Sequence, residues 1–214
     1  MKTLRSALDV LSKARRPYVI LNIGYYGLVI CSMAFTALNP SFHQALMAAV
    51  GESLSDGLLA PVVDAYSAER IVLATALTVG INVSVGSFAT ITLPSLILPF
   101  SGLLMAVVRA VLWGMLFAPR SVAGIGAGQV GAALLMAILV LLEGQGYVLA
   151  SLGAYLHGRA FLRPRRVGLD SRRQGYSYGL KTQARIYALV VVVLLIAAVY
   201  EVLIAVYAIP VLLR

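Results

Sequence analysis

Apolar residues follow one another along this chain in long continuous stretches, not in alternation with polar residues. A stretch of about 20 apolar residues is long enough to cross a bilayer as an α-helix, whereas barrel strands alternate. The sequence therefore predicts an all-α fold, a polytopic transmembrane helical bundle of five spans in one domain over residues 18–210. The predicted spans cover residues 18–38, 70–88, 97–117, 124–157 and 186–208.

The segment 124–157 is longer than one span needs, and the polar sequence Glu143-Gly144-Gln145-Gly146 lies in its middle. Two interpretations are open. One is a single long helix, kinked at this point. The other is a span followed by a short broken segment, which would make six spans. Two full crossings would place the basic segment that follows on the outer side, against the rule that Lys and Arg stay cytoplasmic. One net crossing is therefore preferred.

Amphipathic helices are expected at both membrane surfaces. Residues 1–17 carry Leu4, Leu8 and Leu11 at helical spacing among basic residues. This pattern is typical of a helix lying on the cytoplasmic face, although an ordinary juxtamembrane extension fits it too. Residues 39–69 also repeat apolar positions at helical spacing. They predict a helix at the outer interface, followed by a short turn.

Two local signals mark the ends of these elements. Ser41 is the expected N-cap of the outer helix. Residues 90–99 are apolar and contain Pro94 and Pro99. They predict a tight turn that dips into the membrane between the second and third spans.

Composition and charge agree with a membrane location and predict the orientation. The chain has 214 residues, of which 61% are hydrophobic and only 12% charged, whereas soluble domains are about a quarter charged. The net charge is +9, with basic residues gathered in residues 1–17 and 158–185 and acidic residues in 39–69. The N-terminus and the basic loop 158–185 are therefore expected on the cytoplasmic side, and the acidic loop 39–69 outside. Anionic lipid head groups suit this charge, and a nucleic-acid partner is not expected.

Ionisable and amide residues lie within the predicted spans. A charge in lipid is costly, so these residues must face protein or water. Arg109 with either Glu143 or Glu201 would make a neutral pair. The group could line a substrate or ion path, grip a partner, or form a structural clasp that fixes helix register. Its members are Asn82, Arg109, Glu143, Gln145 and Glu201.

Arginines concentrate in the basic loop after the fourth predicted span. They fit a solvated, lipid-facing surface, and a docking site for a cytoplasmic partner is the alternative. The residues are Arg159, Arg163, Arg165, Arg166, Arg172 and Arg173.

The sequence contains no pattern that predicts catalysis. It has no His-Glu-x-x-His zinc motif, no phosphate-binding glycine loop and no Gly-x-Ser-x-Gly elbow. No enzyme activity, cofactor or metal is expected. The single cysteine, Cys31, excludes a disulfide within the chain.

The final span resembles a known family. Residues 196–210, with Glu201 and Pro210, look like the closing helix of the stage II sporulation protein M family. Glu143, followed by small residues and a basic end, resembles that family's glutamate-containing helix, and the span with Asn82 resembles its Asn-containing span. The resemblance covers roughly residues 70–210. It implies an integral protein of the bacterial cytoplasmic (inner) membrane without known enzymatic activity, with importance for Asn82, Glu143, Glu201 and Pro210.

Two functional hypotheses follow from these features. The first is a non-enzymatic scaffold or membrane subunit of an envelope complex, which binds other membrane proteins or a second copy of itself. The second is a transport subunit, a permease or small channel, with the segment around Glu143 lining the path. Because the sequence has no nucleotide-binding motif, active transport would require a partner ATPase, which could dock on residues 158–185.

Overall fold

The chain folds as a bundle of helices. The computed structural model describes residues 2–57, 59–119 and 127–213, and these contain helices and turns but no strand, which confirms the all-α prediction. The main α-helices are α1 (Lys2–Lys13), α2 (Arg15–Ala37), α3 (Pro40–Asp56), α4 (Ala60–Ser67), α5 (Ile71–Gly80), α6 (Leu93–Ile97), α7 (Ser101–Leu116), α8 (Ala127–Leu162), α9 (Arg172–Leu203) and α10 (Ile209–Leu212). The shorter elements are the π-helices η1 (Ile81–Thr92) and η3 (Ile204–Ala208) and the 3₁₀ helix η2 (Pro164–Val167).

Four helical segments are long and apolar enough to cross a membrane. They are Arg15–Ala37, Ile71–Ile97, Gly128–Leu162 and Arg172–Leu212. The helix α7 is apolar but has only 16 residues. At 1.5 Å per residue it is about 24 Å long, less than the ~30 Å hydrocarbon core. The fifth crossing therefore stays a prediction.

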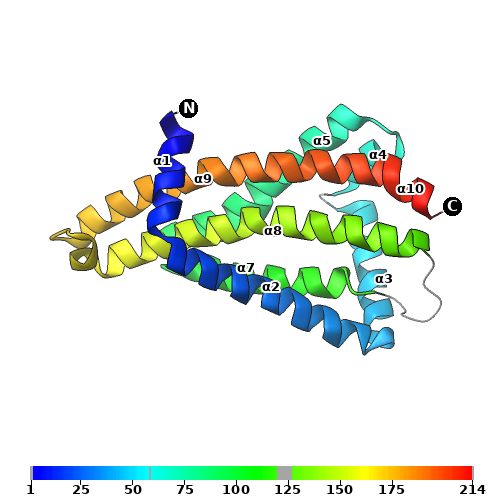
Figure 1. Ribbon diagram of the computed structural model, residues 1–214, viewed down its shortest axis with the longest axis horizontal. Helices are drawn as coiled ribbons and strands as arrows, with labels where there is room; N and C mark the ends of the chain where they lie inside the picture. The colour runs from blue at the N-terminus through cyan, green and yellow to red at the C-terminus, as the bar shows by residue number, and fades with distance from the viewer. Residues whose placement is uncertain (1, 58, 120–126, 214) are drawn as a thin grey trace.

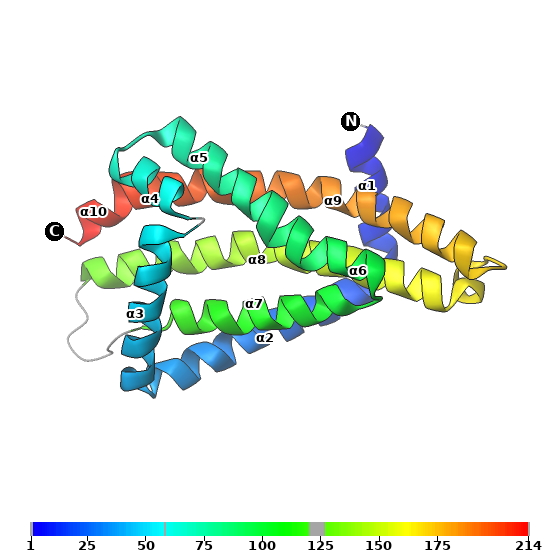
Figure 2. The same cartoon turned by 180° about the vertical axis from the view of Figure 1, so that it is seen from behind.

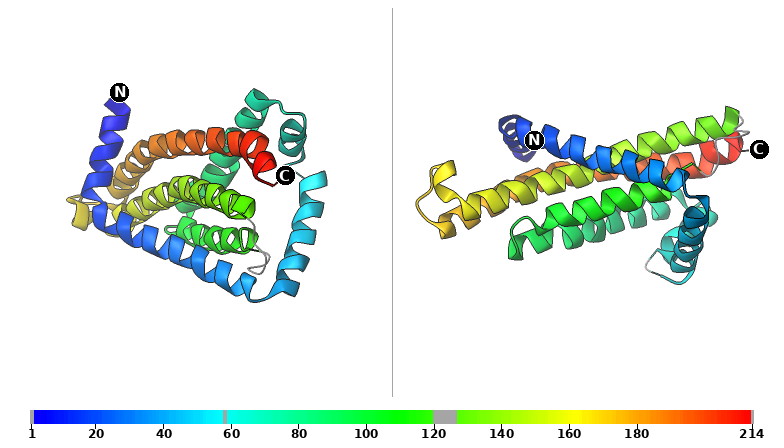
Figure 3. Two further views of the ribbon diagram at one scale, coloured as in Figure 1. Left: turned by 45° about the vertical axis from the view of Figure 1, so that its right-hand side comes forward. Right: turned by 90° about the horizontal axis from the view of Figure 1, so that it is seen from below.

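The antiparallel pair α8 and α9 forms the centre of the bundle (Figure 1). The helix α2 packs along α7 on one side. The continuous helix α5–η1–α6 crosses the pair on the face that is turned toward the viewer in Figure 2. The helix α3 runs across the end of the bundle, where it contacts α2 and α7, and α1 turns away from α2 to pack on α9 (Figure 3).

Glycines let α8 and α9 approach closely near their connection. A Cβ atom on Gly175 would lie 2.1 Å from the carbonyl oxygen of Ala160, and one on Gly179 would lie 2.9 Å from the Cα of His157. Further along the pair, Leu194 is fully buried. Small residues therefore set the spacing of the central pair, as is common in membrane bundles.

The predicted turn at residues 90–99 is wrong. The helix that begins at Ile71 continues to Ile97, and the chain turns only afterwards, where Phe100 adopts φ 70°. Pro94 lies in the first turn of α6, where η1 ends. A proline inside a helix removes one backbone hydrogen bond, and here the helix continues across it directly after the π-helical stretch.

The helix α8 runs without a break through Glu143 to Gly146, so the broken-segment interpretation is wrong. Its glycines serve packing: a Cβ on Gly144 would lie 2.8 Å from the hydroxyl of Tyr26, and one on Gly146 would lie 2.5 Å from Leu194. Residues 124–126 of the predicted span lie outside the described residues.

The basic segment 158–185 is not an extended loop. The helix α8 ends at Leu162 and α9 begins at Arg172, so most of the segment is helical. A helix of 36 residues is about 54 Å long, well beyond the ~30 Å core, so its charged end projects past the apolar part. Ser171 caps α9 by accepting a hydrogen bond from the Gln174 amide at 3.3 Å.

Two further segments, residues 1–17 and 39–69, are helical, as the spacing of their apolar residues predicts. Residues 1–17 contain α1 and the start of α2, and residues 39–69 contain α3 and α4. The N-cap of α3 is Asn39, with Pro40 as the next residue, so the expectation for Ser41 is wrong. Proline favours the first helical position because its missing N–H costs nothing there. The placement of α1, α3 and α4 at membrane surfaces stays a prediction.

Candidate functional site

Three residues singled out in the sequence line one pocket. Asn82 of η1, Glu143 of α8 and the Glu201 side chain of α9 surround a space of ≈ 440 Å³. Tyr66 of α4 and Thr78 of α5 add hydroxyl groups to its lining, which is otherwise mostly apolar. Residues far apart in the sequence therefore form a single mixed site.

Glu143 is connected through Tyr147 to Arg109, and we call these three residues the relay. It is only 5% exposed, and the hydroxyl of Tyr147, one turn further along α8, donates a 2.7 Å hydrogen bond to its Oε1. The guanidinium carbon of Arg109 lies 4.3 Å from the centre of the Tyr147 ring. A cation over an aromatic face is attracted by the ring, and more strongly in a desolvated place.

Arg109 and Glu143 are thus joined through Tyr147. Among the described residues, no direct ion pair links Arg109 to Glu143 or Glu201. Gly86 makes room for the relay, because a Cβ there would lie 3.1 Å from the Tyr147 hydroxyl and 3.5 Å from an Arg109 nitrogen.

Glu201 has different neighbours. Tyr66 lines the same pocket as Glu201, and its hydroxyl lies 3.3 Å from the hydroxyl of Thr78. The short helix α4 therefore contributes to the site from outside the long helices. Together, Tyr66 and Thr78 give the second carboxylate a polar environment.

Two π-helical stretches adjoin the pocket. Asn82 lies at the start of η1, and η3 begins three residues after Glu201. The wider π-turn is rare and is frequently found at functional sites. Here it shifts the lining positions relative to a regular α-helix.

Gln145 lies in a separate polar cluster between α8 and α2. Its Oε1 accepts a 2.6 Å hydrogen bond from the Tyr18 hydroxyl. Its amide nitrogen donates to Asn22 at 2.5 Å and to the Tyr26 hydroxyl at 3.0 Å. Both donors of this amide nitrogen and one acceptor site of its oxygen are used by residues of α2, so Gln145 joins helices.

The arginines of the basic segment divide into two groups. Arg163, Arg165, Arg166, Arg172 and Arg173 are exposed around the α8–α9 connection. Arg159 is partly buried and lines a second pocket, between α1 and the α8–α9 pair.

Sequence reasoning missed several members of these sites. Tyr147 follows Glu143 by four residues, the spacing at which helical side chains meet, and this signal could have identified it. Nothing local points to Tyr66, since its place in the pocket of Glu201 depends on the fold. His157 is fully buried, and its ring lies edge-on to that of Tyr176 with 4.8 Å between the ring centroids.

No known protein family, curated protein or solved structure matches this chain. The resemblance described above therefore rests on the sequence motifs alone.

Chemically, the pocket is suited to binding. Two carboxylates and an amide in a mainly apolar space favour a group that is cationic or rich in hydrogen-bond donors. Within the described parts of the chain, no cluster of three or more His, Cys, Asp or Glu residues could hold a metal ion.

Proposed function

We propose that this protein is a non-enzymatic integral membrane protein that acts as a scaffold or membrane subunit of an envelope complex. We place it with the stage II sporulation protein M family, in the bacterial inner membrane. The support for this family is the motif resemblance around Asn82, Glu143, Glu201 and Pro210.

The proposed topology has five crossings, with α7 as the short fifth span. The basic α8–α9 connection and the N-terminal helix α1 lie on the cytoplasmic side, by the positive-inside rule. The helices α3 and α4 then lie at the outer interface. Their position across the opposite end of the bundle from the α8–α9 connection supports this placement (Figure 1).

One observation carries the scaffold proposal: the interior polar side chains connect different helices. The Gln145 cluster joins α8 to α2, and the relay places Arg109 of α7 on Tyr147 of α8. The hydroxyl of Tyr187 donates to the Val83 carbonyl at 2.7 Å, which joins α9 to η1. Polar contacts of this kind fix the packing of membrane helices, and a rigid bundle suits a structural subunit.

A transport subunit is the second candidate, and the pocket favours it. A space of ≈ 440 Å³ that reaches both Glu143 and Glu201 could admit a small cationic substrate. In this case α4, α5, η1, α7, α8 and α9, which line the pocket, would form the substrate site, and an ATPase would dock on the basic connection.

Carboxylate-to-amide variants separate the two candidates. Glu143→Gln and Glu201→Gln are compared with Asp64→Asn, which makes the same chemical change at an exposed position of α4. The scaffold proposal predicts that both pocket variants weaken assembly or stability, measured by size-exclusion chromatography and thermal unfolding, while Asp64→Asn behaves as wild type. Unchanged assembly and stability in both pocket variants would reject it. Loss of uptake with normal assembly would favour transport.

A further inference from the structure

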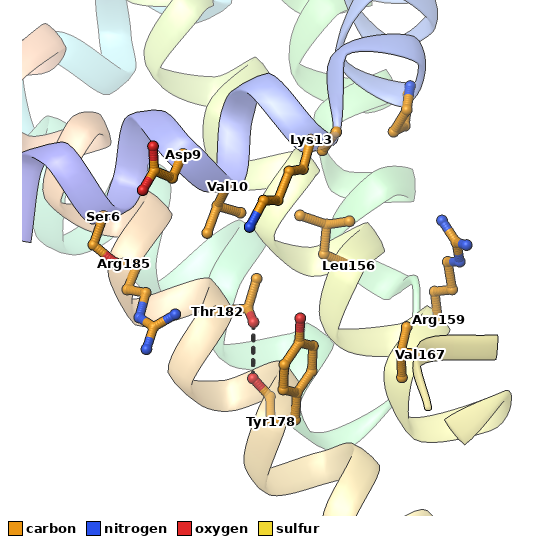
Figure 4. Close-up of a pocket in the computed structure, with 12 residues that line it drawn as sticks. Ser6, Asp9, Val10, Lys13, Leu156, Arg159, Val167, Tyr178, Thr182 and Arg185 are labelled. Atoms are coloured by element: carbon orange, nitrogen blue, oxygen red, sulfur yellow. Dashed lines mark hydrogen bonds between the residues drawn. The ribbon is translucent and has the colours of Figure 1, made fainter. Parts of the chain in front are cut away.

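A second pocket lies where α1 packs against the α8–α9 pair. It has a volume of ≈ 270 Å³ and is built from three helices that are distant in the sequence (Figure 4). It lies at the end of the bundle that carries the basic residues, away from the pocket of Glu143 and Glu201.

Each of the three helices contributes a cation to this pocket. Lys13 comes from the end of α1, Arg159 from the last turn of α8 and Arg185 from α9. Asp9 is the one acidic residue in the lining, so the formal charge is about +2. In the described part of the chain, none of the three cations is in an ion pair with Asp9 or another acid. Their charges are therefore available to a ligand.

The centre of the pocket offers a further donor. Figure 4 shows Lys13 reaching from α1 toward the space in front of the Tyr178 ring on α9. The Thr182 hydroxyl donates to the Tyr178 carbonyl at 2.9 Å, so it is already engaged. The phenol of Tyr178 is not. The lining therefore contains guanidinium groups, an ammonium and a phenol, which are the groups that bind the oxygen atoms of a phosphate, and Figure 4 shows Arg185 and Arg159 on either side of Lys13.

The surroundings indicate where such a phosphate comes from. Val10, Pro17 and Leu156 line the same pocket, so an apolar wall adjoins the cations. On α1, Leu4 and Leu8 are 40% and 50% exposed, as expected of a helix that lies at a lipid surface. A lipid carries its phosphate next to an apolar portion, whereas a soluble phosphate does not.

We propose that this pocket binds the phosphate of an anionic phospholipid, through Lys13, Arg159 and Arg185. The bound lipid joins α1 to the α8–α9 pair. Binding depends on these three side chains of one pocket, unlike the general attraction of the arginines around the α8–α9 connection to a negative membrane surface.

The test uses two full-length variants with the same loss of charge. Lys13→Gln, Arg159→Gln and Arg185→Gln are combined in the pocket variant. Arg165→Gln, Arg166→Gln and Arg172→Gln are combined in the control, because these exposed arginines do not line the pocket. Each protein is purified in mild detergent and titrated with phosphatidylglycerol, phosphatidylcholine, glycerol 3-phosphate or inorganic phosphate. Native mass spectrometry and the fluorescence of Trp113 on heating report binding and stability.

The proposal predicts that phosphatidylglycerol binds to wild type and control and raises their melting temperature. Its affinity for the pocket variant falls at least about a hundredfold, since each charge-assisted hydrogen bond to the phosphate that is lost accounts for roughly a tenfold effect or more. Equal binding by the pocket and control variants would overturn the proposal. So would equally tight binding of glycerol 3-phosphate or inorganic phosphate, which would indicate a soluble ligand.

A charge-preserving variant guards against a folding defect. Lys13→Arg with Arg185→Lys keeps the net charge and both positions are exposed, so folding is expected to be normal. This variant should retain phosphatidylglycerol within a few-fold of wild type. If it loses binding as completely as the pocket variant while its melting temperature is unchanged, charge is not what holds the lipid, and the proposal fails.

Discussion

Removal of the Tyr147 hydroxyl tests the hydrogen bond within α8 that connects Tyr147, and through its ring Arg109 of α7, to Glu143. Tyr147→Phe keeps the ring beneath Arg109 and removes only the 2.7 Å hydrogen bond to Glu143. An intramolecular hydrogen bond contributes about 0.5–1.5 kcal/mol, and a buried polar group left without its partner adds to the loss. Because Tyr147 is fully buried and its acceptor Glu143 is only 5% exposed, we expect a loss of about 1.5 kcal/mol.

The protein contains its own reporter for this measurement. Trp113 is the single tryptophan of the chain, and its ring lies edge-on to Tyr147 with 5.9 Å between centroids. Equilibrium unfolding in mixed micelles, followed by Trp113 fluorescence, gives the free energy of each variant. Tyr207→Phe is the matched control, since Tyr207 is 59% exposed and its change should stay within about 0.5 kcal/mol.

A third variant separates the hydroxyl from the ring. Tyr147→Leu also removes the cation–π contact with Arg109, which adds up to about 2 kcal/mol when desolvated. We therefore expect Tyr147→Leu to be less stable than Tyr147→Phe. If Tyr147→Phe unfolds within about 0.5 kcal/mol of wild type, the hydrogen bond does not stabilise the bundle and the reasoning is refuted.

Three further predictions concern packing, the second polar cluster and orientation. Gly175→Ala should lower the free energy of unfolding by about 1–3 kcal/mol, because its Cβ overpacks the α8–α9 contact. Gly24→Ala is the control and should be neutral, since a Cβ there has nothing within 4 Å. Equal unfolding free energies of the two variants would contradict the close approach of α8 and α9. Gln145→Leu should lower stability by about 1–2 kcal/mol, because three side chains on α2 lose their hydrogen bond to Gln145. An unchanged melting curve would argue against a structural role of Gln145. In a Cys31→Ser background, Asp170→Cys should resist a membrane-impermeant thiol reagent in intact cells and react after lysis; labelling of intact cells would reverse the proposed topology.

The sequence predicts the helical class because continuous apolar runs have few other solutions. It also marks Asn82, Glu143 and Glu201 as unusual, since polar residues in a span need partners, and the structure places all three at one pocket. These conclusions depend only on local composition and on the cost of burial in lipid.

Other features depend on the fold and are not visible in the sequence. Pro94 predicts a turn, but it lies inside the continuous helix Ile71–Ile97, directly after its π-helical stretch. The sequence Gly144-Gln145-Gly146 suggests a break in the helix. In the structure the two glycines leave space for Tyr26 and Leu194, and Gln145 faces α2. In each case the neighbouring helix decides, and its position cannot be read from local spacing.

Affinity purification of the full-length protein from native membranes in mild detergent, with the recovered proteins identified by mass spectrometry, tests the central claim most directly. The scaffold account predicts cell-envelope proteins at a constant ratio to this chain, or a defined homo-oligomer. A stoichiometric ATPase, or a monomer with no partner, would contradict it.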